Sequence, residues 1–317
     1  MKMIDWGADW KVSTLCFGVL PMGPMGRDLS AEEGGRILLE SFERGVNFID
    51  TAQSYGTYPH IRWALDRYTG GKIYVATKSA AESYEDMEEA VMEAREQLGL
   101  QHIDIFHLHA ARVKPDVFEV RRGALECLAD CKARGIIGRA GISTHSVTVV
   151  ERAASEDSVD VVFPLINMTG QGVLDGDRDD MIRAIEVVRD AGKPVYAMKA
   201  FAGGNLLDQR REALSFVTSL EGIDVVAVGM VSAKELLVNI ALLHDSEIDD
   251  ELWEETSRNS KRVFIASFLC KGCGTCIEYC PNEALYLEDG VCKIKTDRCI
   301  LCGYCAPRCP EFAIRMV

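Results

Sequence analysis

The sequence predicts an α/β protein, a (β/α)8 TIM barrel followed by a small cysteine-rich domain. Over residues 1–245, eight short runs rich in β-branched and aromatic residues alternate with stretches of helical periodicity. Nine of the chain's 12 cysteines lie in residues 265–317. The 317 residues and the 48% hydrophobic content suffice for one large core and one small one. We therefore expect a barrel at 1–245, a helical linker at 246–264 and a separate domain at 265–317.

Each expected strand is short, and a helical stretch follows it before the next strand begins. The eight ranges are Leu15–Leu20, Asn47–Asp50, Ile73–Lys78, Ile103–His109, Ala140–Ser143, Val159–Pro164, Val195–Lys199 and Val225–Gly229. Because parallel strands need crossover helices, eight such units can close on themselves as a barrel. An open doubly wound sheet is the alternative, although the Gly-x-Gly-x-x-Gly turn of its nucleotide site is missing after the first strand.

The helices between these strands carry boundary signals. Ser30 begins a capping-box pattern, and Ser232 opens the last repeat in the same way. The segment 5–14, which contains two tryptophans, is expected to close the bottom of the barrel. The segment Asp249–Val263 has mixed charge and neither Pro nor Gly, so it predicts a stiff helical connection to the next domain.

Two near-identical cysteine runs end the chain, and each closes with Cys-Pro. They read Cys270-x2-Cys273-x2-Cys276-x3-Cys280-Pro281 and Cys299-x2-Cys302-x2-Cys305-x3-Cys309-Pro310. This spacing is typical of bacterial-type ferredoxins with two [4Fe-4S] clusters, in which the fourth cysteine of each run ligates the other cluster. The expected ligands are therefore Cys270, Cys273, Cys276 and Cys309 for one cluster, and Cys299, Cys302, Cys305 and Cys280 for the second.

Structural zinc and secreted disulfides are the competing interpretations of these cysteines. Zinc sites usually use separated Cys-x-x-Cys pairs rather than three cysteines in seven residues followed by Cys-Pro. The start Met-Lys-Met-Ile-Asp has no long apolar signal region, so we expect a cytoplasmic protein with reduced thiols. Cys292 lies outside the repeated spacing and is expected to stay unligated.

The charge of the chain restricts its partners. A formal net charge of -14 disfavours nucleic acid and anionic membranes, because both would repel an acidic surface. No apolar run has the length that a bilayer-spanning helix requires. A small-molecule substrate and a redox protein are the partners that remain.

Four ionisable residues lie at or just after the carboxyl ends of neighbouring expected strands. Barrel enzymes carry their catalytic residues at this end of the strands. The four residues are Asp50, Tyr55, Lys78 and His109. Their surroundings resemble the successive signatures of the aldo-keto reductases, at Val46–Ala52 with Tyr55-Gly56, Ala76–Lys78, Asp104–His109 and Gly138–Ser143. The resemblance covers about residues 10–243, and it implies that the four residues are the family's catalytic tetrad.

The tetrad also makes chemical sense by itself. A carbonyl that is being reduced develops negative charge on its oxygen, and a tyrosine with an ordinary pKa of about 10 is a poor proton donor at neutral pH. The Lys78 ammonium would lower that pKa for Tyr55, and Asp50 would hold the ammonium in place. His109 would orient the carbonyl or share in proton transfer.

The resemblance implies an NADP cofactor, but several of the expected contacts are replaced. Thr144, Phe163 and Met198 stand where the family has Asn, Gln and a stacking Tyr, and Glu235 stands where an arginine usually binds the 2′-phosphate. Seven candidate nicotinamide-binding residues remain: Ser143, Asn167, Gly203, Gly204, Gly229, Ser232 and Asn239. The sequence leaves NADP(H), NAD(H) and no dinucleotide as alternatives. It shows no flavin signature, yet a flavin stays an open alternative too.

Three functions follow from these features. The chain is expected to be an oxidoreductase that reduces a carbonyl or related unsaturated small molecule with protons from Tyr55 and electrons from NAD(P)H, from the clusters, or from both. The alternatives are a ferredoxin-dependent reductase without nicotinamide, fed by an external ferredoxin or another redox protein, and an electron-transfer subunit of a larger complex with an inert barrel. Because the family's C-terminal tail covers the barrel mouth, we also expect the cluster domain to form part of the substrate lid.

Overall fold

The computed structural model describes residues 1–7, 10–111, 113, 115–258, 263–280, 282–299, 305–306 and 308–316. Its largest element is a sheet of eight parallel strands, in the order β8-β7-β6-β5-β4-β3-β10-β9. The strands are β3 (Leu15–Gly18), β4 (Phe48–Asp50), β5 (Tyr74–Ser79), β6 (Ile103–Ala110), β7 (Ile137–Thr144), β8 (Val161–Pro164), β9 (Tyr196–Ala197) and β10 (Val225–Gly229). Each overlaps the range expected from the sequence.

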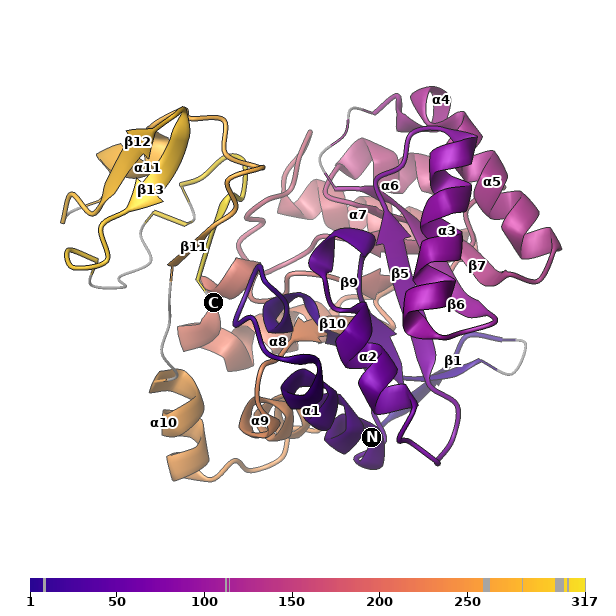
Figure 1. The fold of residues 1–317 in the computed structure, drawn as a ribbon, viewed down its shortest axis with the longest axis horizontal. Coiled ribbons are helices and arrows are strands. Elements are labelled where there is room, and N and C mark those ends of the chain that lie inside the picture. Colours follow the sequence, from indigo (N-terminus) through magenta and orange to yellow (C-terminus); the bar gives the residue numbers. More distant parts are fainter. Residues whose placement is uncertain are drawn as a thin grey trace.

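The sheet closes on itself between its first and last strands. Parallel bridges join Val162 to Val195 and Leu165 to Met198, which links β8 to the segment that contains β9. Helices surround the strands, as Figure 1 shows. The predicted (β/α)8 barrel is therefore confirmed.

Ten α-helices lie in the described residues of the barrel and of the segment that follows it. They are α1 (Ala31–Glu43), α2 (Tyr58–Leu65), α3 (Tyr84–Leu98), α4 (Val117–Val120), α5 (Arg122–Ala133), α6 (Val147–Ala153), α7 (Arg178–Asp190), α8 (Arg210–Ser219), α9 (Ala233–Leu243) and α10 (Asp250–Arg258). Ser30 caps α1 in a capping box with Glu33, and Ser232 caps α9. Both caps satisfy backbone N–H groups that have no partner within the helix. No helix within the described residues is long and apolar enough to cross a membrane.

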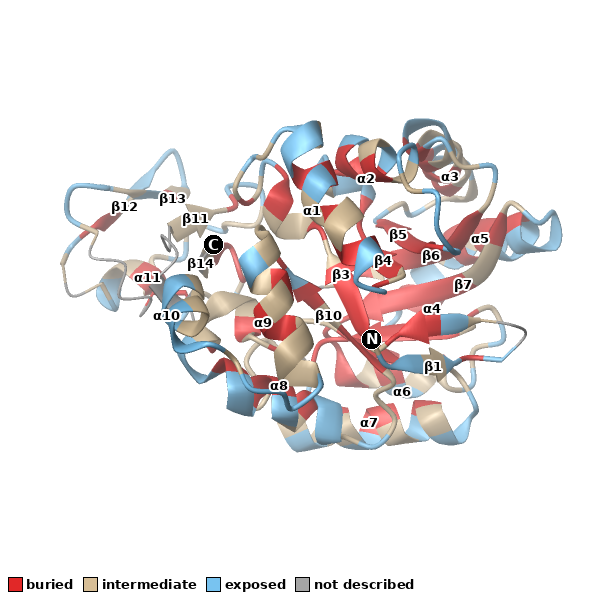
Figure 2. Ribbon diagram, turned by 90° about the horizontal axis from the view of Figure 1, so that it is seen from below, coloured by how far each residue is buried: buried red, intermediate tan, exposed pale blue. Residues whose placement is uncertain are grey.

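An N-terminal hairpin closes one end of the barrel, as expected for segment 5–14. Its strands are β1 (Met3–Asp5) and β2 (Lys11–Ser13). Trp6 follows β1, is buried, and lies 5.6 Å from the Phe48 ring between centroids. Its indole N–H donates to Asp224 at 3.0 Å, so the only polar atom of the side chain is satisfied. The eight strands of the barrel are largely buried, whereas the surrounding helices alternate between buried and exposed residues (Figure 2).

The C-terminal part has a small core of its own, built largely from cysteines and aliphatic residues. Its elements are β11 (Val263–Ile265), α11 (Thr275–Glu278), β12 (Leu285–Glu288), β13 (Val291–Ile294) and β14 (Ile314–Met316). Two antiparallel pairs, β11 with β14 and β12 with β13, hold it together. It lies beside the barrel, and helix α10 precedes it (Figure 1). Helix α10 packs on α9, and its Trp253 ring lies 3.6 Å from the Arg210 guanidinium.

Candidate active site

The carboxyl ends of the strands bring the four tetrad residues to one rim. Asp50 ends β4, Lys78 is in β5, and His109 is in β6. Tyr55 ends the short helix η2 (Gln53–Tyr55) that follows β4. The Lys78 ammonium lies 4.9 Å from the centroid of the Tyr55 ring, and the His109 and Tyr55 rings meet edge to face with centroids 6.4 Å apart.

A buried ion pair forms the base of this group. The Lys78 ammonium donates to Asp50 Oδ2 at 2.5 Å and to the backbone oxygen of Thr51 at 2.7 Å. Burial by itself would lower the pKa of Lys78, but the negative charge of Asp50 and the nearby Tyr55 raise this pKa. The ammonium therefore stays charged at neutral pH. Because it carries three donors, one N–H remains for the Tyr55 side of the site.

His109 is a neutral group at this rim. Burial, and then the positive charges of Lys78, Lys199, Arg121 and Arg315, lower the pKa of His109 to about 3. An imidazole with this pKa is uncharged at neutral pH, so it can position an oxygen by a hydrogen bond but cannot serve as the acid. Of the two roles expected for His109, the pKa favours orienting the carbonyl.

A hydrogen-bonded chain that no sequence pattern indicated lies beneath the tetrad. The Tyr196 hydroxyl donates to Asp50 Oδ1 at 3.1 Å, and His107 Nε2 lies 2.6 Å from the same hydroxyl. Because the only proton of Tyr196 goes to Asp50, His107 must carry its proton on Nε2. Tyr196 also stacks on Phe163 with ring centroids 3.9 Å apart. An aromatic residue in a buried strand is ordinarily a packing residue, so only the fold reveals this contact.

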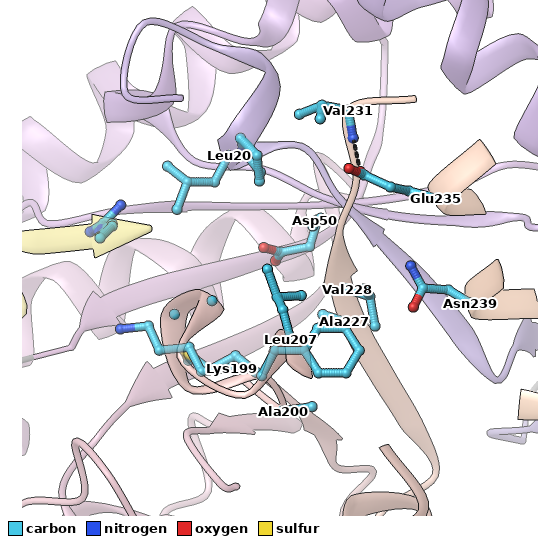
Figure 3. A pocket seen from close by; sticks show the side chains of 18 of the residues that line it. Leu20, Asp50, Lys199, Ala200, Leu207, Ala227, Val228, Val231, Glu235 and Asn239 are labelled. Atoms are coloured by element: carbon cyan, nitrogen blue, oxygen red, sulfur yellow. Dashed lines mark hydrogen bonds between the residues drawn. The ribbon is translucent and has the colours of Figure 1, made fainter. Parts of the chain in front are cut away.

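A cavity of about 270 Å³ opens at the same rim. Asp50 and Tyr55 line it, together with mostly apolar side chains such as Leu20, Leu207 and Val228 (Figure 3). Two residues of the C-terminal part, Phe312 and Arg315, line it as well. The cavity is therefore shared between the barrel and the end of the cysteine-rich domain, as the expected lid requires.

The candidate nicotinamide residues divide into two groups. Gly203, Gly204, Gly229 and Asn239 line the cavity, and the Ser143 hydroxyl is buried without a hydrogen-bond partner among the described residues. These five would suit the backbone cradle and the carboxamide contact of a nicotinamide cofactor.

The other two candidates are already engaged by their own loops. The Asn167 amide donates to the backbone oxygen of Gln171 and accepts from Thr169. Ser232 caps α9. At the same helix start, the Glu235 carboxylate accepts from the Val231 N–H at 2.7 Å (Figure 3). The end of α9 where a phosphate would bind thus already faces a carboxylate of the chain itself.

The cysteines expected to ligate the first cluster lie around one hollow. Cys270, Cys273, Cys276 and Cys309, the expected ligands of one cluster, line a single hollow. Of the second set, Cys280, Cys299 and Cys305 lie in described parts of the chain, and Cys302 lies outside the described residues. Cys292 lines the first hollow too, with its Sγ 3.4 Å from that of Cys276.

Backbone amides of this domain point at the cysteine sulfurs. The N–H of Ala284 donates to Cys280 Sγ at 3.2 Å, and that of Ala313 donates to Cys309 Sγ at 3.3 Å. Each amide lies four residues after its cysteine, so the two runs repeat the same local structure. Such hydrogen bonds stabilise thiolates that ligate iron and help to set the reduction potential of a cluster. The four cysteines around the first hollow therefore suit a [4Fe-4S] cluster.

Comparison with known proteins agrees with this architecture. Residues 14–213 match the model of the aldo/keto reductase family, and residues 269–314 match that of the 4Fe-4S dicluster domain. The chain belongs to the aldo/keto reductase family, and it carries a 4Fe-4S dicluster domain at its carboxyl end. The family that the sequence motifs indicated is thereby confirmed. The protein is an enzyme with an iron-sulfur domain.

Some similar proteins match the barrel, and others match the cysteine-rich part. An uncharacterized oxidoreductase of Schizosaccharomyces pombe is 29% identical over 150 residues, which cover 42% of this chain and 47% of that protein. Ferredoxin-1 of Caulobacter vibrioides is 37% identical over 55 residues, 17% of this chain and 49% of that protein. The chain thus spans about half the length of these two relatives. An aldo-keto reductase structure from Bacillus halodurans superposes with a TM-score of 0.64 at 20% identity, covering 80% of this chain and 94% of that one, which shows the shared fold.

Proposed function

We propose that the protein reduces a carbonyl or conjugated unsaturated small molecule in the cavity at the barrel mouth, with electrons that arrive through its own [4Fe-4S] clusters. The observation that carries this proposal is the shared cavity, in which Phe312 and Arg315 from the cluster domain face the same space as Tyr55. If the clusters served an electron path unrelated to the substrate, their domain would not need to contribute side chains to the substrate cavity.

The proton chemistry is assigned to the tetrad. Tyr55 donates a proton to the substrate oxygen, and the charged Lys78 beside its ring stabilises the phenolate that remains. Asp50 holds Lys78, while neutral His109 positions the substrate oxygen. The reduction consumes two electrons and two protons, and the second proton comes from water that enters from the cavity mouth.

The clusters, held by the two cysteine sets, supply single electrons. This suits a conjugated substrate that tolerates stepwise reduction, and it requires an external electron donor such as a reduced ferredoxin. The position of Glu235 at the start of α9 supports this source over NADPH, since its carboxylate would repel a 2′-phosphate.

Reduction by NAD(P)H is the second candidate. The observation in its favour is that Gly203, Gly204, Gly229 and Asn239 line the cavity, and that the buried Ser143 hydroxyl lacks a partner among the described residues. In this case the clusters would be structural or would serve a separate electron path.

One assay separates the two candidates. Anaerobically purified full-length protein is given a panel of small conjugated carbonyls, with either dithionite-reduced ferredoxin or NAD(P)H as the electron source. We expect substrate reduction with the ferredoxin alone, and loss of this activity in Cys273→Ser, which removes an expected cluster ligand. Turnover with NAD(P)H alone, unchanged in Cys273→Ser, would instead establish the second candidate.

A further inference from the structure

An arginine of the cluster domain reaches the cavity from outside the barrel. Arg315 belongs to β14, which pairs with β11 and packs against η3 (Ala202–Gly204) at the barrel rim. Figure 3 shows the end of this strand, in yellow, at the edge of the cavity. Arg315 and Tyr55 both line that space, and the charge of Arg315 is close enough to lower the pKa of His109. The guanidinium thus lies beside the reactive rim.

Among the described residues, no carboxylate pairs with the Arg315 guanidinium. Its Nη1 is buried and has no hydrogen-bond partner in this part of the chain. The two carboxylates that line the cavity have other partners, since Asp50 binds Lys78 and Glu235 binds the Val231 N–H. A buried guanidinium donor without an acceptor is costly, because it has lost water and gained nothing in exchange. Such a donor is better explained by an acceptor that a ligand supplies.

A second cation from the barrel increases the positive potential at this place. The Lys199 ammonium lies 4.7 Å from the centroid of the Phe312 ring and 3.0 Å from His145 Nε2. Lys199 follows β9 and lines the cavity, as does Phe312. The barrel and the cluster domain therefore both place positive charge at one end of a cavity whose other walls are mainly apolar.

We propose that the substrate carries a carboxylate that binds Arg315, so that the substrate class is small keto acids and conjugated unsaturated acids. The planar guanidinium matches a carboxylate through two parallel N–H donors. A cavity of about 270 Å³ is small for an organic ligand, which fits an acid of a few carbons with an apolar body. This inference rests on the proposed function, because it names the substrate of that site.

The test measures binding without turnover. Isothermal titration calorimetry on anaerobic full-length protein compares crotonate with crotonamide and 2-oxobutanoate with 2-oxobutanamide. We expect each acid to bind the wild type about tenfold or more tightly than its amide, and Arg315→Gln to remove this preference. Arg315→Lys should recover part of it. Arg308→Gln is the matched control, because Arg308 is an exposed arginine of the same domain that does not line the cavity.

Three outcomes would overturn the inference. One is equal affinity of the wild type for acids and amides, and another is an unchanged preference in Arg315→Gln whose cluster absorbance and thermal midpoint match the wild type. The third is a loss in Arg315→Gln that affects inorganic phosphate or NADPH and spares the acids, which would make Arg315 part of a phosphate site. The calorimetry measures binding and not turnover. A missing preference for acids would therefore overturn this inference alone, because Tyr55-dependent reduction of neutral carbonyls is tested separately.

Discussion

The two sides of the cavity differ in the charged group that they hold: the Tyr55 side has the Lys78 ammonium, and the α9 side has the Glu235 carboxylate. On the Tyr55 side, a buried ammonium is held by Asp50 and Thr51, and it lies 4.9 Å from the centroid of the Tyr55 ring. On the α9 side, Glu235 binds the Val231 N–H at the helix start, so the place for an anion is already taken. Under the proposed function, the Tyr55 side carries the proton chemistry, and the α9 side presents a carboxylate where a phosphate would bind.

The largest effect is expected from removing the proton donor. Tyr55→Phe should lower turnover of the best carbonyl substrate by roughly 10²–10⁴-fold, because the ring and its packing remain while the transferable proton is lost. Steady-state reduction rates measure this change, with binding of the same substrate followed by calorimetry. Tyr68→Phe, which removes a hydroxyl away from the cavity, is the control and should behave as the wild type. Normal turnover in Tyr55→Phe would remove this residue from its role.

Loss of the buried cation should affect stability as well as rate. Lys78→Met leaves the Asp50 carboxylate buried without its counter-ion, which is expected to cost about 3–5 kcal/mol in the free energy of unfolding. Urea denaturation followed by circular dichroism, at matched cluster content, tests this. The double variant Asp50→Asn/Lys78→Met should recover much of the loss, since no uncompensated charge remains. If Lys78→Met is as stable as the wild type, the ion pair between Lys78 and Asp50 does not stabilise the fold as described.

The smallest effect is expected on the α9 side. Glu235→Gln removes the carboxylate from the helix start, so NADPH should bind roughly tenfold more tightly than to the wild type. Fluorescence titration measures this affinity. Glu212→Gln, an exposed acidic residue in the first turn of α8, is the matched control and should leave the affinity unchanged. Tight NADPH binding to the wild type that Glu235→Gln does not improve would show that the two sides do not differ as described.

Sequence reasoning worked best where a local pattern has one physical meaning. The period of the hydrophobic runs and the caps at Ser30 and Ser232 predicted the strands and helix starts, because both depend on neighbours within a few residues. The tetrad was predictable for a related reason. Parallel strands place their carboxyl ends at one rim, so the proximity of residues far apart in the chain could be predicted from the strand ranges.

Contacts between distant side chains were not predictable in the same way. Tyr196 meets Asp50 and His107 across 146 and 89 positions of the chain, and nothing near Tyr196 distinguishes it from a packing aromatic. Glu235 gave a partial signal, since a carboxylate at that position repels phosphate wherever it points. Its bond to the Val231 N–H, which occupies the helix start, came only from the fold.

The amino-acid sequence by itself determined the barrel, the cysteine spacing of the second domain and the four ionisable residues at the strand ends. Each follows from periodicity or spacing, which are properties of the chain as written. Only the tertiary structure decided that Arg315 of β14 lines the same cavity as Tyr55, with a guanidinium nitrogen that no described residue binds. Its surroundings are set by how the barrel and the cysteine-rich part pack together, and that packing depends on surfaces that no local pattern encodes.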